Sequence, residues 1–294
     1  MQTLILQAII SGILLGLIYG LIGMGMNIIY GVMRVVNFAH GEFMIIGSYM
    51  AFWMGRVFGL NVLESFVITL PMFFMLGLIL YYLTVPRLLR SEDPEMASFL
   101  TFFGVSLIIT SVILLLWGAD PRSIPFPFNR VSFTVGSQFI PMGRIISGGF
   151  CVATIVLLSI FLFKTYTGQA IRAIIQNREA VSILGIDPHQ ISSIAFGIGL
   201  FLVGMAGGLV TLSFPAITPV MGQSYTLVAF VVIVLGGLGS PIGALLGGLL
   251  FGLAENLGAI FMPTALAPVI AFVLLIVMIL IRPQGIMGKA IVGI

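Results

Sequence analysis

Charged residues are scarce in this chain, and their scarcity decides its class. Only 7% of its 294 residues are Asp, Glu, Lys or Arg and 60% are hydrophobic, whereas soluble domains carry about 25% charged residues. A charge at the centre of a bilayer costs roughly 2.5–3.5 kcal/mol, so membrane proteins avoid charges there or keep them in loops. No charged residue precedes Arg34, and between Asp187 and Glu255 the only acidic or basic residue is His189. The composition therefore indicates an integral membrane protein.

Cysteine and catalytic motifs are also lacking. The lone Cys151 excludes a disulfide framework and a cysteine-based metal site, and neither an H-E-x-x-H helix nor a G-x-S-x-G elbow is present. The phosphate loop G-x-x-x-x-G-K-[ST] is missing too, because the only Gly-Lys pair, Gly288 and Lys289, is followed by Ala290. These absences argue against a membrane hydrolase, predict no metal site, and require any ATP hydrolysis by that route to occur in another protein.

Long apolar runs fill most of the sequence. Because one membrane helix needs about 20 apolar residues, we predict an all-α, polytopic transmembrane bundle that forms a single domain over residues 1–294. It has about eight to nine membrane segments, some of them broken or re-entrant. The predicted segments are residues 4–30, 43–58, 62–85, 96–117, 145–163, 191–212, 224–238, 242–261 and 265–281.

Basic residues in short loops predict the orientation, because cytoplasmic loops are enriched in Lys and Arg. Three basic pairs fall on one face of the predicted bundle, namely Arg87 with Arg90, Arg172 with Arg178, and Arg282 with Lys289. Taking that face as cytoplasmic puts the N-terminus outside and the C-terminus inside. The loop at residues 118–144 conflicts with this assignment, because it is placed outside yet carries Arg122, Arg130 and Arg144.

Glycine is abundant, and two sets of glycines recur every four residues. They are Gly12, Gly16 and Gly20, and Gly239, Gly243 and Gly247. This spacing puts each set on one helical face, where small residues let a neighbouring helix approach closely. Packing within the chain is the favoured interpretation, and a subunit interface is the alternative.

The first apolar segment is too long for one straight span. At about 1.5 Å per residue it extends well past a hydrocarbon core of about 30 Å. We therefore expect the helix to break around Gly23, Gly25 and Asn27.

The densest group of polar side chains is the segment Asn37-Phe38-Ala39-His40-Gly41-Glu42, which follows the first apolar run. Polar groups beside or within a membrane usually mark a substrate path or a fixed polar contact. Two interpretations stay open. Either Asn37, His40 and Glu42 line part of a translocation pathway, or Asn37 caps a helix while the other two meet water at the headgroups.

The internal loop at residues 167–187 is long enough for a short amphipathic helix. Ala173, Ala180 and Leu184 are predicted to share its apolar face, with Arg172 or Glu179 toward solvent. Such a helix between two spans can receive a partner protein. The alternative, a helix lying on lipid, needs a larger apolar face than these residues supply.

In its order of motifs the chain resembles the LivH-like family, the permease subunits of branched-chain amino-acid ABC importers. The resemblance covers nearly the whole chain and is carried by residues 30–42, 167–186, 236–244 and 282–285. Glu179, Ala180 and Gly185 also match the E-A-A-x-x-x-G motif by which importer permeases resemble one another at their ATPase contact. The match is partial, because Val181 replaces the second Ala and no Leu-Pro follows.

The resemblance implies a division of labour among several proteins of a bacterial cytoplasmic membrane. This chain, which is not an enzyme and binds no cofactor, pairs with a second homologous permease. Two cytoplasmic ATPases carry ATP and Mg²⁺, and a periplasmic or lipid-anchored binding protein captures the substrate. The ATPase-coupling loop would comprise Thr167, Gly168, Arg172, Ala173, Asn177, Arg178, Glu179, Ala180 and Gly185.

The expected substrates are leucine, isoleucine and valine, and the alternatives are urea or short amides. A stand-alone secondary transporter is the main rival, but such proteins often carry acidic residues near the midplane. Here Glu42, Glu64 and Glu255 can each be placed at the end of a span. With so few buried charges, an amino acid would be guided by backbone groups and by hydroxyls such as those of Ser224 and Thr226.

Overall fold

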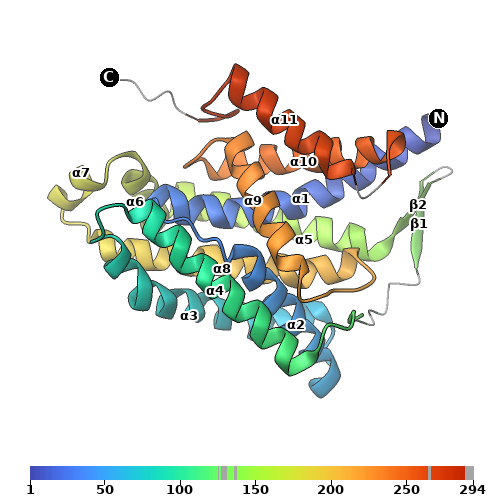
Figure 1. Cartoon of the computed structure of the whole chain (residues 1–294), viewed down its shortest axis with the longest axis horizontal. Coiled ribbons are helices and arrows are strands. Elements are labelled where there is room, and N and C mark those ends of the chain that lie inside the picture. The colour runs from blue at the N-terminus through green and yellow to red at the C-terminus, as the bar shows by residue number, and fades with distance from the viewer. Residues whose placement is uncertain (125, 127–130, 136–137, 264–265, 289–294) are drawn as a thin grey trace.

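The computed structural model describes residues 1–124, 126, 131–135, 138–263 and 266–288, so Arg130 and Lys289 lie outside the described residues. Most helices run along one long axis (Figure 1). They are α1 (Gln2–Met33), α2 (His40–Phe58), α3 (Val62–Leu88), α4 (Pro94–Trp117), α5 (Met142–Lys164), α6 (Tyr166–Gln176), α7 (Arg178–Ile183), α8 (Pro188–Ser213), α9 (Met221–Gly236), α10 (Pro241–Phe261) and α11 (Ala267–Ile281).

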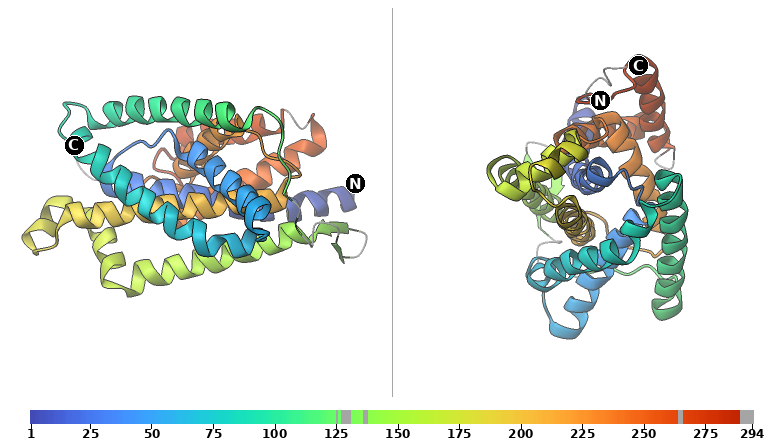
Figure 2. Two further views of the ribbon diagram at one scale, coloured as in Figure 1. Left: turned by 90° about the horizontal axis from the view of Figure 1, so that it is seen from below. Right: turned by 90° about the vertical axis from the view of Figure 1, so that its left-hand side faces the viewer.

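The structure also contains a short β-hairpin that an all-α prediction lacks. Strands β1 (Ser132–Val135) and β2 (Gln138–Pro141) pair antiparallel, with Ser132 opposite Pro141. The hairpin lies at the same end of the molecule as the N-terminus, which we call the hairpin end (Figure 2). Helices α6 and α7 lie at the opposite end, which we call the α6–α7 end.

Each predicted apolar segment coincides with one helix of the described chain. Six helices, α1, α3, α4, α5, α8 and α10, are long and apolar enough to cross a membrane, while α9 and α11 are apolar but shorter. Helix α2 falls outside both groups. The helical bundle is therefore confirmed at the level of a polytopic helical protein.

Helix α8 forms the centre of the bundle. It packs against α1, α2, α3 and α5, and 83% of its most apolar stretch is buried, against 17% of the corresponding stretch of α4. A helix that is apolar all round is buried in protein or lies in a membrane. The contrast therefore assigns α8 to the protein core and α4 to the periphery.

The predicted break in α1 is wrong. Helix α1 runs through all 32 of its residues, because Gly23 and Gly25 serve close packing instead of a bend. A Cβ on Gly25 would lie 2.8 Å from the Gly199 carbonyl oxygen of α8. Asn27 bonds to the turn between α9 and α10, because its Nδ2 donates to the carbonyls of Gly237 and Ser240, each at 3.0 Å.

The chain re-enters the bundle after α1 instead of within it. Arg34 ends the helix with a left-handed φ of 53°, and residues 34–39 lead back to the start of α2. His40 Nε2 lies 3.1 Å from the carbonyl oxygen of Ile22, so α2 begins level with the middle of α1.

A second re-entry lies between α8 and α9. Ser213, at the end of α8, is level with Ser11 near the start of α1, because Arg144 bonds to both. The ring of Tyr225 in α9 lies 6.4 Å from that of Tyr19, further along α1. Residues 214–220, which include Pro215 and Pro219, thus carry the chain back inward (Figure 1).

Candidate functional site

The N-terminal ends of α2 and α9 meet inside the molecule. The Gly41 amide donates to Thr226 Oγ1 at 2.8 Å, and the Thr226 hydroxyl donates to Glu42 Oε2 at 3.2 Å. A Cβ on Gly222 would lie 3.0 Å from Glu42 Cα, and one on Gly41 would collide with the Gly222 carbonyl oxygen. Glycine is therefore needed on both helices. We call this contact of Gly41, Glu42, Gly222 and Thr226 the α2–α9 junction.

The electrostatics of the junction suit a buried acidic group. Glu42 is 2% exposed, and its carboxyl carbon would lie 3.2 Å from a Cβ placed on Gly222 in the first turn of α9. Neither α2 nor α9 has a side-chain hydrogen bond at its N-cap. Helix N-termini carry partial positive charge and stabilise acidic groups. Two converging N-termini thus compensate a carboxyl group that lipid alone would not tolerate.

The other two members of the predicted cluster are buried beside the junction. Asn37 and His40 are 1% and 0% exposed, so the interpretation that His40 and Glu42 meet headgroup water is wrong. Asn37 Oδ1 accepts the Ala39 amide at 3.1 Å, next to the start of α2. Asn37 Nδ2 and His40 Nδ1 are buried without a hydrogen-bond partner. Their role in a translocation pathway stays a prediction.

Helix α6 packs against the bundle and presents few free groups. Gly168 lies against α5, where a Cβ would come 2.6 Å from Leu162 Cα. The Arg172 guanidinium lies 4.1 Å from the centre of the Phe163 ring, a favourable cation–π distance. Thr167 and Ala173 are partly buried. These predicted coupling residues therefore hold α6 in place.

Helix α7 is separate from α6, although a single helix was predicted. Asn177 Oδ1 accepts the amides of Glu179 and Ala180, each at 3.0 Å, so it caps a new helix. Arg178 ties α7 to the bundle, because its NH1 donates to the Val32 carbonyl at 3.3 Å and to Ser192 Oγ at 3.4 Å.

The predicted apolar face of this segment is wrong in two of its three members. Ala180 is exposed and Leu184 is 76% exposed, whereas the buried face consists of Ala170, Ile171, Ile174 and Val181. The pattern changes because the chain turns at Asn177.

The tip of α7 instead presents both apolar and charged groups. Ile183 is 86% exposed next to Leu184, and Glu179 is exposed on the same short helix. Gly185 follows with a φ of +77° and no atom near its missing Cβ, so it needs glycine for its backbone and not for space.

The first glycine set packs within the chain, as favoured. A Cβ on Gly12 would lie 2.9 Å from the Gly252 carbonyl oxygen, and one on Gly16 would lie 2.8 Å from that of Gly248. Gly20 continues this contact at Leu245. Gly248 and Gly252, which were not predicted to take part, form the opposite face of this contact on α10.

The second set is only partly helical. Gly243 and Gly247 face α9, not α1, but Gly239 lies in the turn before α10 with a φ of +77°. The prediction that Gly239 shares their helical face is therefore wrong, because α10 begins at Pro241.

Sequence reasoning also missed a cavity at the hairpin end. Its volume is about 500 Å³, and Arg144 and Glu255 both line it. Glu255 lies in the interior of α10, so its predicted placement at the end of a span is wrong, whereas Glu42 and Glu64 do lie in the first turns of α2 and α3. A lone acidic residue within a long apolar run was the available signal.

A family of known proteins matches the sequence of this chain along almost its whole length. Residues 8–280 match the profile of the permease component of branched-chain amino acid transport systems. The high-affinity branched-chain amino acid transport system permease protein BraD of Pseudomonas aeruginosa is 31% identical over 295 residues, which cover 97% of this chain and 96% of BraD.

Two relatives from Escherichia coli carry different names. The high-affinity branched-chain amino acid transport system permease protein LivH is 28% identical, over 97% of this chain and 96% of its own. The permease protein LivM of a system with the same name is 26% identical, over 93% of this chain and 68% of its own.

A solved structure also shares the fold. PsaBC from Streptococcus pneumoniae, in complex with Fab, matches with a TM-score of 0.51 at 12% identity, covering 95% of this chain and 91% of that chain. At so low an identity the likeness concerns the arrangement of helices alone.

Proposed function

Because this chain belongs to the family of permease components of branched-chain amino acid transport systems, we propose that it is the permease subunit of an ABC importer for leucine, isoleucine and valine. The match over residues 8–280 carries this proposal, since it runs from the first turns of α1 to the end of α11. The whole chain then acts as one transmembrane permease domain.

The importer contains other proteins. A second, homologous permease subunit is supported by the two differently named E. coli relatives, LivH and LivM, that both resemble this chain. Two cytoplasmic ATPases bind ATP and Mg²⁺, and a periplasmic or lipid-anchored protein delivers the substrate. This chain itself binds no cofactor and catalyses no reaction.

The bundle crosses the bacterial cytoplasmic membrane about nine times, with α2 and α9 as the re-entrant partners. The α6–α7 end faces the cytoplasm, so the N-terminus lies outside and the C-terminus inside. Basic residues gather at this end, which agrees with the enrichment of Lys and Arg on the cytoplasmic side. They lie at helix termini or in the segments that connect the long helices, and they are Arg34, Arg87, Arg90, Arg172, Arg178 and Arg282. Arg56, Arg122 and Arg144 belong to the opposite end.

Helix α7 is the docking element for an ATPase. Exposed apolar side chains rimmed by polar residues are typical of protein contacts, and Ile183, Leu184 and Glu179 supply both kinds. Arg178 and the packed face of α6 would pass a displacement of α7 to α1, α5 and α8.

The translocation pathway passes the α2–α9 junction. Asn37, His40 and Glu42 are buried there, and two of them keep an unpaired polar atom. Irregular backbone at membrane depth is tolerated where protein buries it or where it lines a cavity, and transporters place substrate sites at such helix ends. Separation of α2 from α9 would open this region.

Reconstitution tests the function directly. Vesicles that hold this chain, the second permease and both ATPases should accumulate labelled leucine only when ATP and the binding protein are supplied. Exclusive uptake of urea or a short amide would refute the assignment of the substrate but not the assignment as an ABC importer. Leucine uptake driven by an ion gradient without ATP would refute the importer as well.

A further inference from the structure

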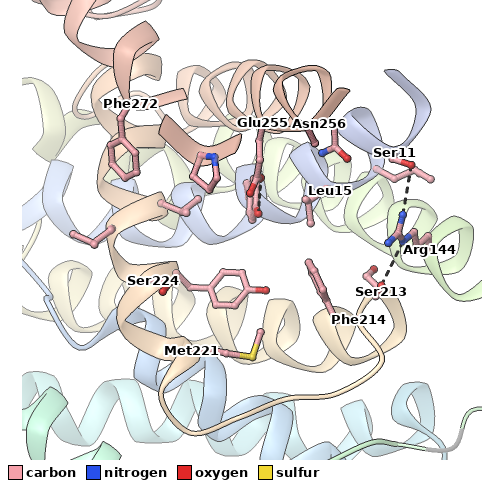
Figure 3. A pocket seen from close by; sticks show the side chains of 17 residues that line it. Ser11, Leu15, Arg144, Ser213, Phe214, Met221, Ser224, Glu255, Asn256 and Phe272 are labelled. Atoms are coloured by element: carbon pink, nitrogen blue, oxygen red, sulfur yellow. Dashed lines mark hydrogen bonds between the residues drawn. The ribbon is translucent and has the colours of Figure 1, made fainter. Parts of the chain in front are cut away.

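The cavity at the hairpin end is separate from the α2–α9 junction. It is about 500 Å³ in volume and is lined by α1, α5, α9, α10 and α11 together with Ser213 and Phe214 (Figure 3). Small-molecule sites are typically clefts of about 300–1,000 Å³ with apolar walls and a few convergent polar groups. Leu14, Leu15, Phe214, Val228 and Phe272 supply the apolar wall here.

Arg144 brings a positive charge to this cavity. Its Nε donates to the Ser213 carbonyl at 3.4 Å and its NH1 to Ser11 Oγ at 3.5 Å (Figure 3). Both distances exceed the usual range of about 2.7–3.2 Å, and both acceptors are neutral. Within the described part of the chain no acidic side chain pairs with Arg144. The N–H groups of Arg144 that make neither of these bonds are therefore available to a carboxylate, which guanidinium binds through two parallel hydrogen bonds.

Glu255 brings the opposite charge from a different helix. Its Oε2 accepts a hydrogen bond from the Tyr19 hydroxyl at 2.9 Å, and Tyr225 also lines the cavity beside it. No basic side chain of the described residues pairs with it. Ionisable groups in a membrane protein are costly unless they are paired, so an acidic and a basic group that share a cavity without touching require an explanation.

We propose that this cavity binds the zwitterion of an aliphatic α-amino acid, with its carboxylate on Arg144, its ammonium on Glu255 and its side chain against the apolar wall. One such molecule supplies both missing charges at once. A neutral amide or urea supplies neither, and a simple carboxylate or amine supplies one. The inference rests on the proposed function. It adds that the permease itself binds the substrate selectively after the binding protein has released it.

Helix α9 connects the cavity with the α2–α9 junction. Its residues Ser224 and Leu227 are exposed and line the cavity. Helix α9 also carries Thr226, whose side chain bonds at the α2–α9 junction. A displacement of α9 would therefore alter the cavity and the junction together.

Protection of a cysteine at Ser224 tests the site without relying on transport. In the assembled complex with Cys151→Ala and Ser224→Cys, leucine should slow labelling by a small aqueous thiol reagent. Leucinamide and 4-methylpentanoate, which each lack one charge, should not protect. Arg144→Gln or Glu255→Gln should raise the leucine concentration that gives half-protection by about tenfold or more, because each removes a charged hydrogen-bond partner.

Matched controls separate this result from a general loss of charge. Arg56→Gln removes an arginine that does not line the cavity, and Glu64→Gln retains the capping acceptor of α3 while removing an acidic charge; both should keep normal protection. Equal protection in Arg144→Gln and Glu255→Gln, protection by either analogue, or a Ser224→Cys that is never labelled would overturn the proposal. Leucine uptake by the reconstituted vesicles separates a failure of this proposal from a failure of the proposed function. Uptake without protection refutes the cavity site alone.

Discussion

At the α2–α9 junction a carboxyl group, a hydroxyl and two glycines are buried between two helix ends, whereas at α7 a carboxylate, two aliphatic side chains and a glycine face outward. Glu42 is 2% exposed, and Leu184 is 76% exposed. Both regions interrupt an apolar chain with polar residues. Their surroundings differ, because the polar groups of the junction bond within the chain, whereas the side chains of Glu179, Ile183 and Leu184 face away from it.

This difference teaches how the same residue types serve different purposes. Gly41 is a glycine because no room exists for a Cβ, whereas Gly185 is a glycine because its φ is positive and the space beside it is open. Glu42 is satisfied by Thr226 and two helix ends, whereas Glu179 is exposed on α7. Substitutions at the junction should therefore cost folding stability, and those at α7 should cost coupling.

Gly41→Ala should have the largest effect on stability. The added Cβ would collide with the Gly222 carbonyl oxygen and come 2.6 Å from the Thr226 amide nitrogen, both of them backbone atoms. Overpacking typically costs about 1–3 kcal/mol and sometimes more, and backbone cannot yield here without moving a helix. We expect a loss of about 3 kcal/mol or more, measured as a lower thermal midpoint of the detergent-solubilised protein by size exclusion. Gly104→Ala, with no atom within 4 Å of its Cβ, is the control, and an equal loss there would contradict the comparison.

Thr226→Val should have an intermediate effect. It removes the acceptor of the Gly41 amide and the donor to Glu42 while keeping the size of the side chain. Leaving buried polar groups without partners costs about 1–3 kcal/mol. Thr226→Ser keeps the hydroxyl and should recover most of the thermal midpoint. If Val and Ser were equally stable, the hydrogen bonds would not be what holds the junction.

Gly185→Leu should leave the bundle stable and still impair transport. A non-glycine residue in this left-handed conformation costs about 1–2 kcal/mol, and that strain falls on an exposed turn next to α7. We expect normal membrane insertion with reduced co-elution of the ATPase and reduced substrate-stimulated hydrolysis, and Glu179→Lys should act in the same direction. Asn tolerates the conformation better, so Gly185→Asn should retain more coupling than Gly185→Leu. Normal coupling in the double variant Gly185→Leu with Glu179→Lys would remove α7 from the docking role.

The helices could be predicted from the sequence because long apolar runs exclude other structures. Each expected segment coincides with a helix. The position of the re-entry could not be predicted, because length alone argues for a break in α1, and only the packed structure shows that Gly23 and Gly25 face neighbouring helices. The same glycines can either bend a helix or admit a neighbour, and the sequence does not distinguish these uses.

Half of the junction could be predicted as well. The polar cluster around His40 and Glu42 is visible in the sequence, but its partner Thr226 lies 184 residues beyond Glu42. The presence of Arg144 and Glu255 in one cavity depends in the same way on how α5 and α10 are placed. The apolar face predicted from periodicity at residues 167–187 was wrong, because Asn177 caps a second helix whose buried face points in another direction.

Cysteine labelling should show the difference in water accessibility between α7 and the α2–α9 junction, and it is the smallest change to the protein among these tests. In a Cys151→Ala background, Ala180→Cys on α7 should react quickly with a small aqueous thiol reagent in the permease without its ATPase, because Ala180 is exposed there. Asn37→Cys should be almost inert in the resting complex, because Asn37 is 1% exposed. Ala180→Cys should leave the thermal midpoint unchanged, because Ala180 is exposed, whereas Asn37→Cys should lower it moderately, because it removes the acceptor of the Ala39 amide.

The two sites should respond differently to ATP turnover. If the pathway passes the junction, α2 and α9 must separate during the cycle, and Asn37→Cys should become reactive only while the assembled importer hydrolyses ATP with substrate present. Bound ATPase should instead shield Ala180→Cys throughout. Fast labelling at Asn37 in the resting state would mean that the junction is open to water. Inertness at Asn37 throughout turnover in a transporting complex would assign the cluster to packing, because a side chain on the path must meet water when the substrate passes.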